Sequence, residues 1–390
     1  MELYVPQEER LLVQTRRQSL TFGVPRESVW NENRVALTPE GVDLLVSRGH
    51  QVKVETGAGD MARYTDAAYA EAGAELVYDT PEVFRCPWVV KVQPPTLEEL
   101  GHMSLGATLV SALQPSSLRK EIVEALMLKR ITALAYEHLE DAHHQKPFVR
   151  SMGEIAGSTA ILLAADYLST TLNGRGYVMG GVTGVPPTDV VILGAGMVGT
   201  VAARVARGMG AHVRVFDTSL TRLHRLQSQV DASVHTVVMQ PRLLAKALMD
   251  CDVAIGALRA ENGRTPVVVS EAVVSQMKTG SIVVDVSIDQ GGCFETSEIT
   301  SWQSPSFERF GVLHIGIPNL AARTARTASF ALNNLTAPLL DRWSEAGGWE
   351  GIVDRYPGVA RGVYVFGGTL TSRPLGERFD LPYSEIGLLL

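Results

Sequence analysis

The feature that most constrains this chain is a glycine-rich turn, Gly194–Gly199 (GAGMVG), between a strand pattern and a helix pattern. The apolar run Val190–Leu193 before it predicts a buried strand, and Met197–Gly208 after it predicts a helix. Gly194 permits the tight turn, Gly196 lets the backbone approach a pyrophosphate, and Gly199 permits close packing of helix on strand. Free N–H groups at the start of such a helix bind phosphate oxygens. The motif predicts a dinucleotide-binding α/β unit, and the alternative is a glycine turn in an α/β domain that binds no nucleotide.

The residue after the next predicted strand indicates which nucleotide is bound. The strand His212–Phe216 is followed by Asp217, whose carboxylate can accept hydrogen bonds from ribose hydroxyls and would repel a 2′-phosphate. Arg222 and Arg225 lie nearby and weaken this preference. The sequence favours NAD over NADP. The expected cofactor-binding residues are Gly194, Ala195, Gly196, Met197, Val198, Gly199, Asp217, Gly256, Ala257 and Asp289.

Composition excludes several classes of protein. A chain of 390 residues with 45% hydrophobic residues predicts two or three domains with a sizeable core. A net charge of −7 argues against non-specific nucleic-acid binding. The cysteines Cys86, Cys251 and Cys293 lie far apart, which fits a reducing compartment and excludes a disulfide framework or thiolate zinc cluster. No apolar stretch reaches about 18 residues and the start is no secretory signal, so we expect a cytoplasmic protein without a membrane or nucleic-acid partner.

Strand and helix patterns alternate along the whole chain, as in βαβ units with parallel sheets. A long helix is expected roughly over Gly153–Leu172, followed by a Gly- and Pro-rich boundary, Asn173–Asp189. A helix near Ser116, a further helix over Thr324–Arg342 and a loop-rich tail are also expected. The first-half strands are expected over Leu20–Val24, Gln51–Glu55, Trp88–Val92, Thr108–Leu113 and Ile131–Tyr136.

The predicted fold class is therefore α/β, with two Rossmann-like, doubly wound domains and mostly parallel sheets. The second unit is contiguous, whereas the first recruits the C-terminal helix because too little chain remains after residue 320 for a separate domain. We expect a substrate domain over residues 1–150 plus 326–390 and an NAD-binding domain over residues 151–325.

Open α/β sheets bind ligands beyond the carboxyl ends of their strands, so polar residues at those ends are candidates. In the first half these are Asn31-Glu32-Asn33-Arg34 after the first strand, Lys91, Gln114 and Glu137. An arginine and a lysine that converge there suit a small carboxylate substrate, because guanidinium binds the carboxylate as a fork and ammonium polarises a carbonyl. Equally, Arg34 could be a surface ion-pair partner and Lys91 an extended side chain with an exposed ammonium.

The second half adds two candidates at the same kind of position. Asp289 follows a strong apolar strand and is expected at the rim that faces the nicotinamide, where a carboxylate can assist proton transfer. The alternative is an aspartate that caps a turn beside glycines. Asn319 follows the strand predicted over Val312–Ile315. The pair His143-His144 lacks metal-ligand spacing and is interpreted as a solvated turn, so no metal site is expected.

Several stretches together resemble the superfamily of alanine dehydrogenases and pyridine-nucleotide transhydrogenase α-subunits, over nearly the whole chain after about residue 20. Tyr136-Glu137 and Asp289–Glu295 resemble the alanine dehydrogenase branch more. The other matching stretches are Gly23–Glu27, Glu32–Pro39, Arg48–Val52, Glu55–Gly59, Glu71–Ala74, Val90–Val92, Glu154–Gly157, Gly180–Val185 and the dinucleotide motif.

The resemblance implies residue roles. Arg34 and Lys91 would hold the substrate carboxylate and carbonyl, and Asp289 would be the catalytic carboxylate beside the nicotinamide. Asp217 would bind the adenosine ribose, and Asn319 would line the cleft. It also implies two domains that close around the substrate and a homohexamer.

The chain also departs from the family pattern. Gln114 stands where alanine dehydrogenases carry a catalytic histidine, so it can hydrogen-bond a substrate oxygen but cannot transfer a proton near neutral pH. The family's Lys-Val-Lys-Glu-Pro corresponds here to Lys91-Val-Gln-Pro-Pro95, and its Asn-Met-Pro corresponds to Asn319-Leu-Ala321. Gly153 stands in place of the serine of the family's Met-Ser-Glu. An N-terminal extension of about twenty residues precedes the resemblance.

The leading hypothesis is NAD-dependent, reversible oxidative deamination of L-alanine to pyruvate and ammonia, with Lys91, Asp289 and Gln114 as catalytic candidates and Arg34, Lys91 and Asn319 as substrate-binding candidates. A second hypothesis is an NAD(H)-binding module like a transhydrogenase α-subunit, which Gln114 favours slightly. A third is a related amino-acid dehydrogenase with a larger substrate, of the saccharopine type. The expected partner is a small amino or keto acid as substrate.

Overall fold

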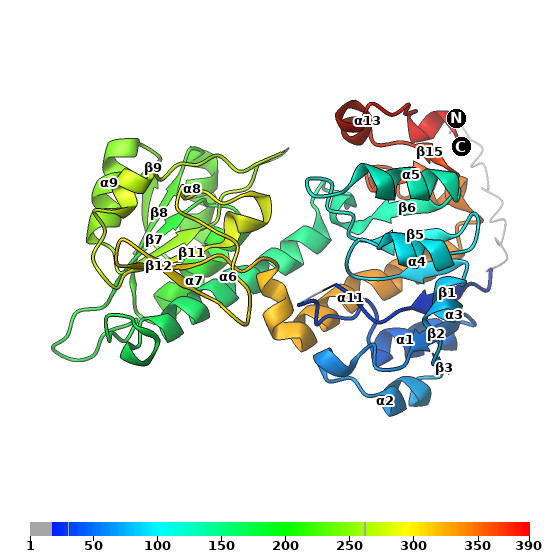
Figure 1. Ribbon diagram of the computed structural model, residues 1–390, viewed down its shortest axis with the longest axis horizontal. Coiled ribbons are helices and arrows are strands. Elements are labelled where there is room, and N and C mark those ends of the chain that lie inside the picture. Colours follow the sequence, from blue (N-terminus) through cyan, green and yellow to red (C-terminus); the bar gives the residue numbers. More distant parts are fainter. Residues whose placement is uncertain (1–17, 30, 261–262) are drawn as a thin grey trace, which may run out of the picture.

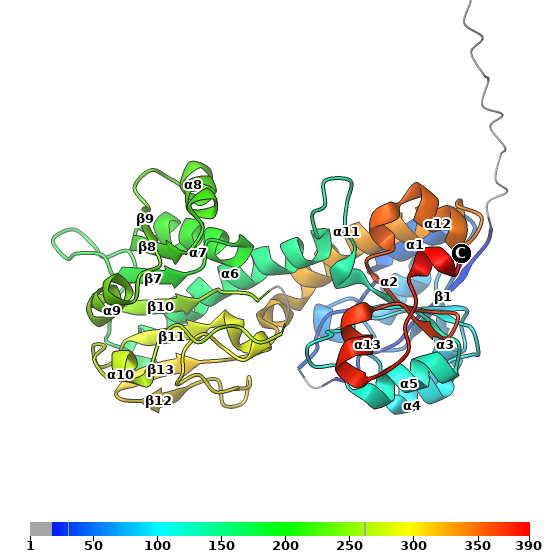
Figure 2. The same ribbon diagram turned by 90° about the horizontal axis from the view of Figure 1, so that it is seen from above.

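The computed structural model describes residues 18–29, 31–260 and 263–390. Two α/β lobes lie at the ends of an elongated molecule, and the long helices α6 (Pro147–Tyr167) and α11 (Ala325–Ser344) run between them (Figures 1 and 2). Most of the N-terminal extension, to which the prediction of no secretory signal applies, lies outside the described residues.

The first lobe is built on an eight-stranded sheet with the order β15-β14-β6-β5-β4-β1-β2-β3. Its strands pair in parallel except for β14 and β15, which are antiparallel. The elements of this lobe are β1 (Thr21–Val24), α1 (Pro39–Ser47), β2 (Gln51–Glu55), α2 (Asp66–Glu71), β3 (Glu75–Val77), α3 (Thr80–Phe84), β4 (Trp88–Val90), α4 (Leu97–His102), β5 (Thr108–Ser111), α5 (Lys120–Leu128), β6 (Thr132–Ala135), α12 (Trp349–Arg355), β14 (Val363–Phe366), β15 (Thr369–Leu370) and α13 (Arg373–Phe379).

The second lobe is built on a seven-stranded sheet with the order β12-β13-β11-β10-β7-β8-β9, in which only the edge strand β12 is antiparallel. The elements of this lobe are β7 (Asp189–Leu193), α7 (Met197–Gly208), β8 (His212–Asp217), α8 (Leu220–Gln229), β9 (His235–Val238), α9 (Pro241–Asp250), β10 (Val253–Gly256), α10 (Glu271–Val274), β11 (Ile282–Asp285), β12 (Phe307–Arg309) and β13 (Val312–Ile315).

The parallel parts of the two sheets share one topology. Across the sheet, neighbouring strands follow the order β3-β2-β1-β4-β5-β6 in the first lobe and β9-β8-β7-β10-β11-β13 in the second. Both are the doubly wound order in which the chain reverses direction next to the first strand, and the crevice at this reversal is where such sheets bind ligands. The α/β class with two Rossmann-like sheets is confirmed, and the reversal lies between β1 and β4 in one sheet and between β7 and β10 in the other.

Helix α6 differs from its expected range. It begins at Pro147, six residues before the expected start, and ends at Tyr167 rather than Leu172. Proline suits the first turn of a helix, where its missing N–H has no partner to lose. Gly157 lies inside the helix, and this position requires glycine because a Cβ there would lie 2.5 Å from the carbonyl oxygen of Val198 on α7. Close packing between the two helices therefore overrides the helix-weakening effect of glycine.

Helix α6 is also long and apolar enough to pass a test of length and composition for a membrane span. Half of the tested window is buried inside the molecule, where it packs on α7 and α11. These contacts are those of a core helix that links the two lobes.

The C-terminal tail is more regular than expected. Instead of a loop-rich segment it contains α12, α13 and a hairpin of β14 and β15, and β14 extends the first sheet next to β6. The hairpin turns at Gly367 and Gly368, which both have positive φ. A Gly-Gly pair after a Val/Tyr/Phe run is a hairpin signal, but the strands are short and become stable only by pairing with β6.

Candidate active site

The glycine-rich turn adopts the geometry that the motif requires. Gly194 has φ +109°, and a Cβ there would lie 2.5 Å from the carbonyl oxygen of Ala257. A Cβ on Gly199 would lie 1.8 Å from the carbonyl oxygen of Gly194. A Cβ on Gly196, the N-cap of α7, would enter open space. The start of α7 is thus tightly packed at Gly194 and Gly199 but unobstructed at Gly196, which leaves room for a phosphate on its free N–H groups.

Asp217 lies at the end of β8, next to this turn, as expected from its position after the second strand. Its Oδ2 accepts the N–H of Ala195 at 2.7 Å, and its Oδ1 accepts the N–H of Ser219 at 2.8 Å. Nη1 of Arg222 lies 3.9 Å from Oδ2. The buried carboxylate therefore holds the glycine turn and the start of α8 in place, and each oxygen has a further lone pair for a ribose hydroxyl.

Gly256 and Ala257 lie on the other side of the chain reversal and are also tightly packed. A Cβ on Gly256 would lie 2.5 Å from Oδ1 of Asp285 and 2.7 Å from Sγ of Cys293. The N–H of Ala257 donates to the carbonyl of Leu193 at 2.8 Å, so this segment lies directly against the glycine turn. Gly256 is a packing position, and Ala257 is the member of the pair that contacts the predicted cofactor loop.

Asp285 explains the shape of the loop that carries Asp289. Its Oδ2 accepts the N–H of Cys293 at 2.8 Å and the hydroxyl of Ser297 at 2.7 Å, and its Oδ1 accepts the N–H of Ser287 at 3.0 Å. One buried carboxylate thereby fixes the turn after β11. Asp289, on that turn, is exposed.

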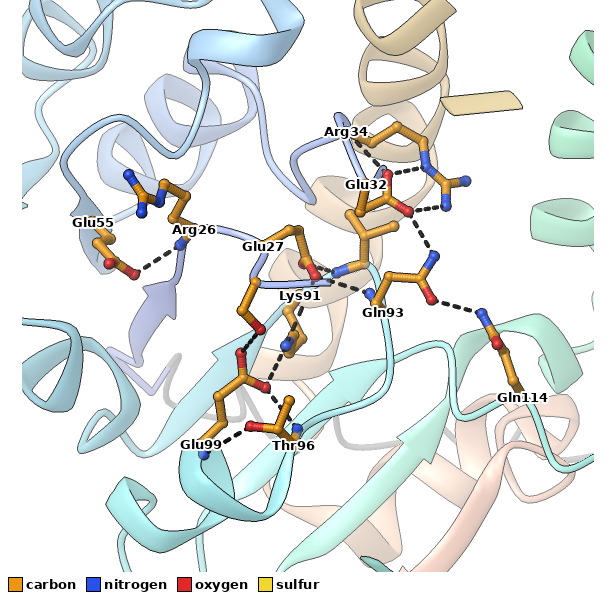
Figure 3. A network of polar contacts seen from close by, with 12 residues as sticks. Arg26, Glu27, Glu32, Arg34, Glu55, Lys91, Gln93, Thr96, Glu99 and Gln114 are labelled. Atoms are coloured by element: carbon orange, nitrogen blue, oxygen red, sulfur yellow. Dashed lines mark hydrogen bonds and ion pairs between the residues drawn. The ribbon is translucent and has the colours of Figure 1, made fainter. Parts of the chain in front are cut away.

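In the first lobe, Arg34 follows β1 and is almost fully buried, at 6% exposure. Its Nε donates to Oε1 of Glu32 at 2.7 Å, and its Nη2 donates to Oε2 of Glu32 at 2.6 Å (Figure 3). Burial opposes ionisation of Glu32, but the charge and hydrogen bonds of Arg34 lower its pKa overall. One edge of the guanidinium is thus occupied, while Nη1 contacts only the weak acceptor Sδ of Met152 at 3.3 Å. The second edge is the one that can bind a substrate carboxylate.

Lys91, after β4, is fully buried with its ammonium between two carboxylates (Figure 3). Its Nζ lies 2.7 Å from Oε2 of Glu99 and 3.8 Å from Oε2 of Glu27. Glu27 also accepts the N–H groups of Val92 and Gln93. Burial raises the pKa of Glu27 to about 7, against the opposing charge of Lys91. In this conformation the ammonium of Lys91 forms ion pairs with the two carboxylates and is not available to a substrate.

Gln93 and Gln114, two of the departures from the family pattern, contact each other in this lobe. Nε2 of Gln114 donates to Oε1 of Gln93 at 2.7 Å, and Nε2 of Gln93 donates to Oε2 of Glu32 at 2.6 Å (Figure 3). Gln114 has φ +48°, which turns the chain sharply after β5. A relay of two amides therefore connects the end of β5 to the carboxylate that holds Arg34.

Asn319 joins the two lobes at this point. It follows β13 in the second lobe, and its Nδ2 donates to Oε2 of Glu32 in the first lobe at 2.8 Å. Its backbone N–H donates to Oδ1 of Asp289 at 2.9 Å. The structure thereby brings Arg34, Gln114, Asn319 and Asp289 into one continuous network of polar contacts around Glu32.

Glu32 was named with Arg34 at the end of the first strand but was given no role. The carboxylates Glu27 and Glu99 and the neutral Gln93 were missed. Glu27 and Glu32 both follow β1, as Arg34 does, and a buried cation needs a counter-charge, so the sequence held a signal for the two carboxylates. In the part of the chain that the structure describes, no group of three or more His, Cys, Asp or Glu residues is arranged to hold a metal ion.

Comparisons with known proteins agree with this architecture. Residues 23–156 match the family model "Alanine dehydrogenase/PNT, N-terminal domain", and residues 160–373 match "Alanine dehydrogenase/PNT, C-terminal domain". Alanine dehydrogenase of Methanococcus maripaludis is 38% identical over 94% of this chain and 98% of its own length. Alanine dehydrogenase 2 of Staphylococcus aureus is 34% identical over 94% of this chain and 98% of its own length.

Solved structures show the same relationship. An L-alanine dehydrogenase has a TM-score of 0.88 and 36% sequence identity, and the match covers 93% of this chain and 99% of that one. The transhydrogenase from Sinorhizobium meliloti has a TM-score of 0.78 and 26% identity over 91% of this chain and 99% of its own. With both domain models matched in order and nearly the whole length aligned, the chain belongs to the alanine dehydrogenase/PNT family.

Proposed function

We propose that this protein is an NAD-dependent alanine dehydrogenase that interconverts L-alanine and water with pyruvate and ammonia. The observation that carries the proposal is the contact of Asn319 with Glu32, because it joins the Arg34 site of one sheet to the predicted cofactor loop of the other. Two family relatives named as alanine dehydrogenases align over almost the whole chain. The domain assignment that we propose is substrate binding by residues 1–150 plus 326–390 and NAD binding by residues 151–325.

The residues of the second lobe fit NAD. The open space in front of Gly196 accommodates a pyrophosphate on the N-terminus of α7, and Asp217 has lone pairs for the adenosine ribose. The same carboxylate disfavours a 2′-phosphate, although Arg222 moderates this effect. Bound NAD supplies the hydride acceptor for the reaction.

The substrate is held by the first lobe. Arg34 binds the substrate carboxylate through Nη1, while Glu32 keeps the guanidinium plane fixed. The second N–H of the Gln114 amide and the side chain of Asn319 are available to substrate oxygen. Lys91 reaches the reacting carbonyl only if its ammonium leaves Glu99. Asp289, exposed and held through the backbone of Asn319, accepts a proton from the attacking water.

The test is formation of NADH by the purified protein with L-alanine and NAD at alkaline pH, followed by ultraviolet absorbance. NADP in place of NAD and D-alanine in place of L-alanine are the matched controls. A panel of further amino and keto acids, saccharopine included, ranks kcat/KM by substrate. Folded protein that binds NADH yet forms none from L-alanine contradicts the proposal.

One observation favours a second function. The neutral Gln93–Gln114 pair offers no proton-transfer group at its position, and the chain is similar to a transhydrogenase along most of its length. An NAD(H)-binding module without substrate chemistry would bind NADH tightly and be inactive with every member of the panel. Activity with any amino acid excludes this function.

We further propose that the protein is a cytoplasmic homo-oligomer, a hexamer as the resemblance implies. Apolar side chains are exposed on α6 and on the loop that follows it, with Leu162 at 49%, Val178 at 67% and Val182 at 62% exposure. Large apolar side chains exposed to this degree are candidates for contact with another chain. All three cysteines are free and buried, which supports a reducing compartment.

A further inference from the structure

Glu137 has a carboxylate oxygen that the fold leaves without a partner. It lies in the 3₁₀ turn Tyr136–His138 that follows β6. Its Oε1 accepts the N–H groups of Leu113 at 2.9 Å and Gln114 at 2.7 Å. Among the described residues, its Oε2 is buried and has no hydrogen-bond partner. A buried carboxylate oxygen without a partner costs free energy, so its persistence here points to a ligand that it binds.

This oxygen lies beside the proposed substrate. The residue whose backbone Glu137 holds is Gln114, whose side chain leads through Gln93 to Glu32 and Arg34. From the second lobe, the guanidinium of Arg259 acts electrostatically on both Glu137 and Asp289. The charge of Arg259 therefore acts on one carboxylate of each lobe, Glu137 in the first and Asp289 in the second.

We propose that Glu137 is a catalytic residue that takes a proton from the substrate ammonium group and later returns it to the departing amine. The inference rests on the proposed alanine dehydrogenase activity. It assigns to Glu137 a proton transfer that the Gln114 amide cannot perform, because an amide does not ionise near neutral pH.

The steps balance as follows. The Glu137 carboxylate takes one proton from the substrate ammonium, and the Cα–H bond breaks as hydride passes to the nicotinamide, which leaves a protonated imine. Water adds to the imine carbon and gives one proton to Asp289. Glu137 then protonates the amine, the C–N bond breaks, and the hydroxyl proton leaves with ammonia as ammonium. Asp289 finally releases its proton to solvent, so one hydride, one proton and one ammonium ion are produced per alanine.

The surroundings of Glu137 suit this task. Burial raises the pKa of Glu137, whereas hydrogen bonds from backbone N–H groups, those of Gln114 and Leu113 among them, and the charge of Arg259 lower it. The other titratable groups that face it are Tyr136 and His138 on its own turn and Tyr364 on β14. Burial raises the pKa of both tyrosines, and burial with the charge of Lys146 lowers the pKa of His138 to about 4. Around neutral pH these three neighbours are uncharged, so Glu137 is the group here that exchanges protons.

Glu137→Gln tests the proposal with little disturbance, because the amide oxygen can still accept the N–H groups of Leu113 and Gln114. We expect kcat with L-alanine to fall by about 100-fold or more. We also expect the acidic limb of the kcat/KM pH profile to disappear and the affinity for NADH to stay unchanged. Glu140→Gln, which removes a carboxylate paired with the exposed His144, is the matched control and should leave all three values unchanged.

Glu137→Asp keeps the carboxyl group and should recover part of kcat together with the acidic limb. The inference is overturned if Glu137→Gln keeps kcat within a few-fold of the unmodified protein. It is also overturned if kcat falls while the shape of the pH profile is unchanged, since a structural defect lowers activity equally at every pH. Inactivity of the unmodified protein with every amino acid in the panel would contradict the proposed function instead.

Discussion

Replacing Lys91 by methionine would show whether its buried ammonium stabilises the fold. Lys91 is fully buried, 2.7 Å from Glu99 and 3.8 Å from Glu27. Glu99 also accepts the N–H of Thr96 at 2.8 Å as part of the capping box of α4, so it cannot turn toward solvent without disrupting that helix. Methionine fills a similar volume but leaves two buried carboxylates without their cation.

The expected loss in the free energy of unfolding is about 3–5 kcal/mol, the range for removing one partner of a buried ion pair. The partly exposed Lys53, which pairs with Glu75 and Glu82, is the matched control, and Lys53→Met should cost less than about 1 kcal/mol. The double variant Lys91→Met/Glu99→Gln removes a charge from each side. We expect it to be more stable than the sum of the single changes predicts, by about 0.5–3 kcal/mol.

The loss should also depend on pH. Burial already raises the pKa of Glu27 to about 7, and Lys91 is the charge that holds it down, so the substitution raises this pKa further. A carboxyl whose pKa is raised by folding contributes stability at low pH and loses it as pH rises through the folded pKa. Lys91→Met should therefore be least stable above pH 7 and recover part of its stability below it.

Denaturant unfolding of the single and double variants, followed by circular dichroism on both sides of pH 7, measures these differences. A Lys91→Met protein as stable as the unmodified one at both pH values would refute the reasoning, as would a double variant with no coupling. If the double variant regains stability but not activity, Lys91 also acts on the substrate.

Three further outcomes follow from the geometry. Gly199→Val should abolish NADH binding in a fluorescence titration, because its Cβ would lie 1.8 Å from the carbonyl oxygen of Gly194 and α7 would have to move away; unchanged affinity contradicts this role. Asp217→Ala should weaken NADH binding by about tenfold or more, the cost of unpaired buried N–H groups, and narrow the preference for NAD over NADP; a variant with the affinities of the unmodified protein would exclude the assignment. Leu162→Glu on α6 should lower the mass measured by light scattering if that face is covered by another copy, whereas the equally polar change Leu128→Glu on α5 should not.

Local sequence patterns were sufficient for the fold class, and they selected several residues of the polar network between the lobes. The strand, glycine turn and helix around Gly194 follow from residues within one short segment, where only glycine meets the steric limits. The rule that ligands bind beyond the carboxyl ends of parallel strands selected Arg34, Gln114, Asp289 and Asn319, and these residues share one polar network. Both the rule and the motif depend on contacts that are near in sequence or fixed by the topology.

Where the sequence misled, the cause was packing between distant segments. The first turn of α6, which precedes the expected start at Gly153, packs on an earlier segment, because Phe148 is buried and its ring stacks on Tyr136. The hairpin of β14 and β15 was read as a loop, since its short strands are stabilised by β6, far earlier in the chain. The role predicted for Lys91 at the substrate remains a prediction, but the sequence did not indicate the carboxylates Glu27 and Glu99 that surround its ammonium.

The sequence by itself therefore determined the two doubly wound sheets and the strand ends at which the candidate site residues lie, because side-chain periodicity and glycine geometry are local properties. Only the tertiary structure decided how the charges there are used. Glu32 binds Arg34 two residues away and Asn319 at a separation of 287 residues, and the same oxygen, Oε2, accepts from both and so joins the two lobes. Which edge of Arg34 stays available, and which oxygen of Glu137 stays unpaired, depends on such long-range hydrogen bonds, whose partners no local pattern specifies.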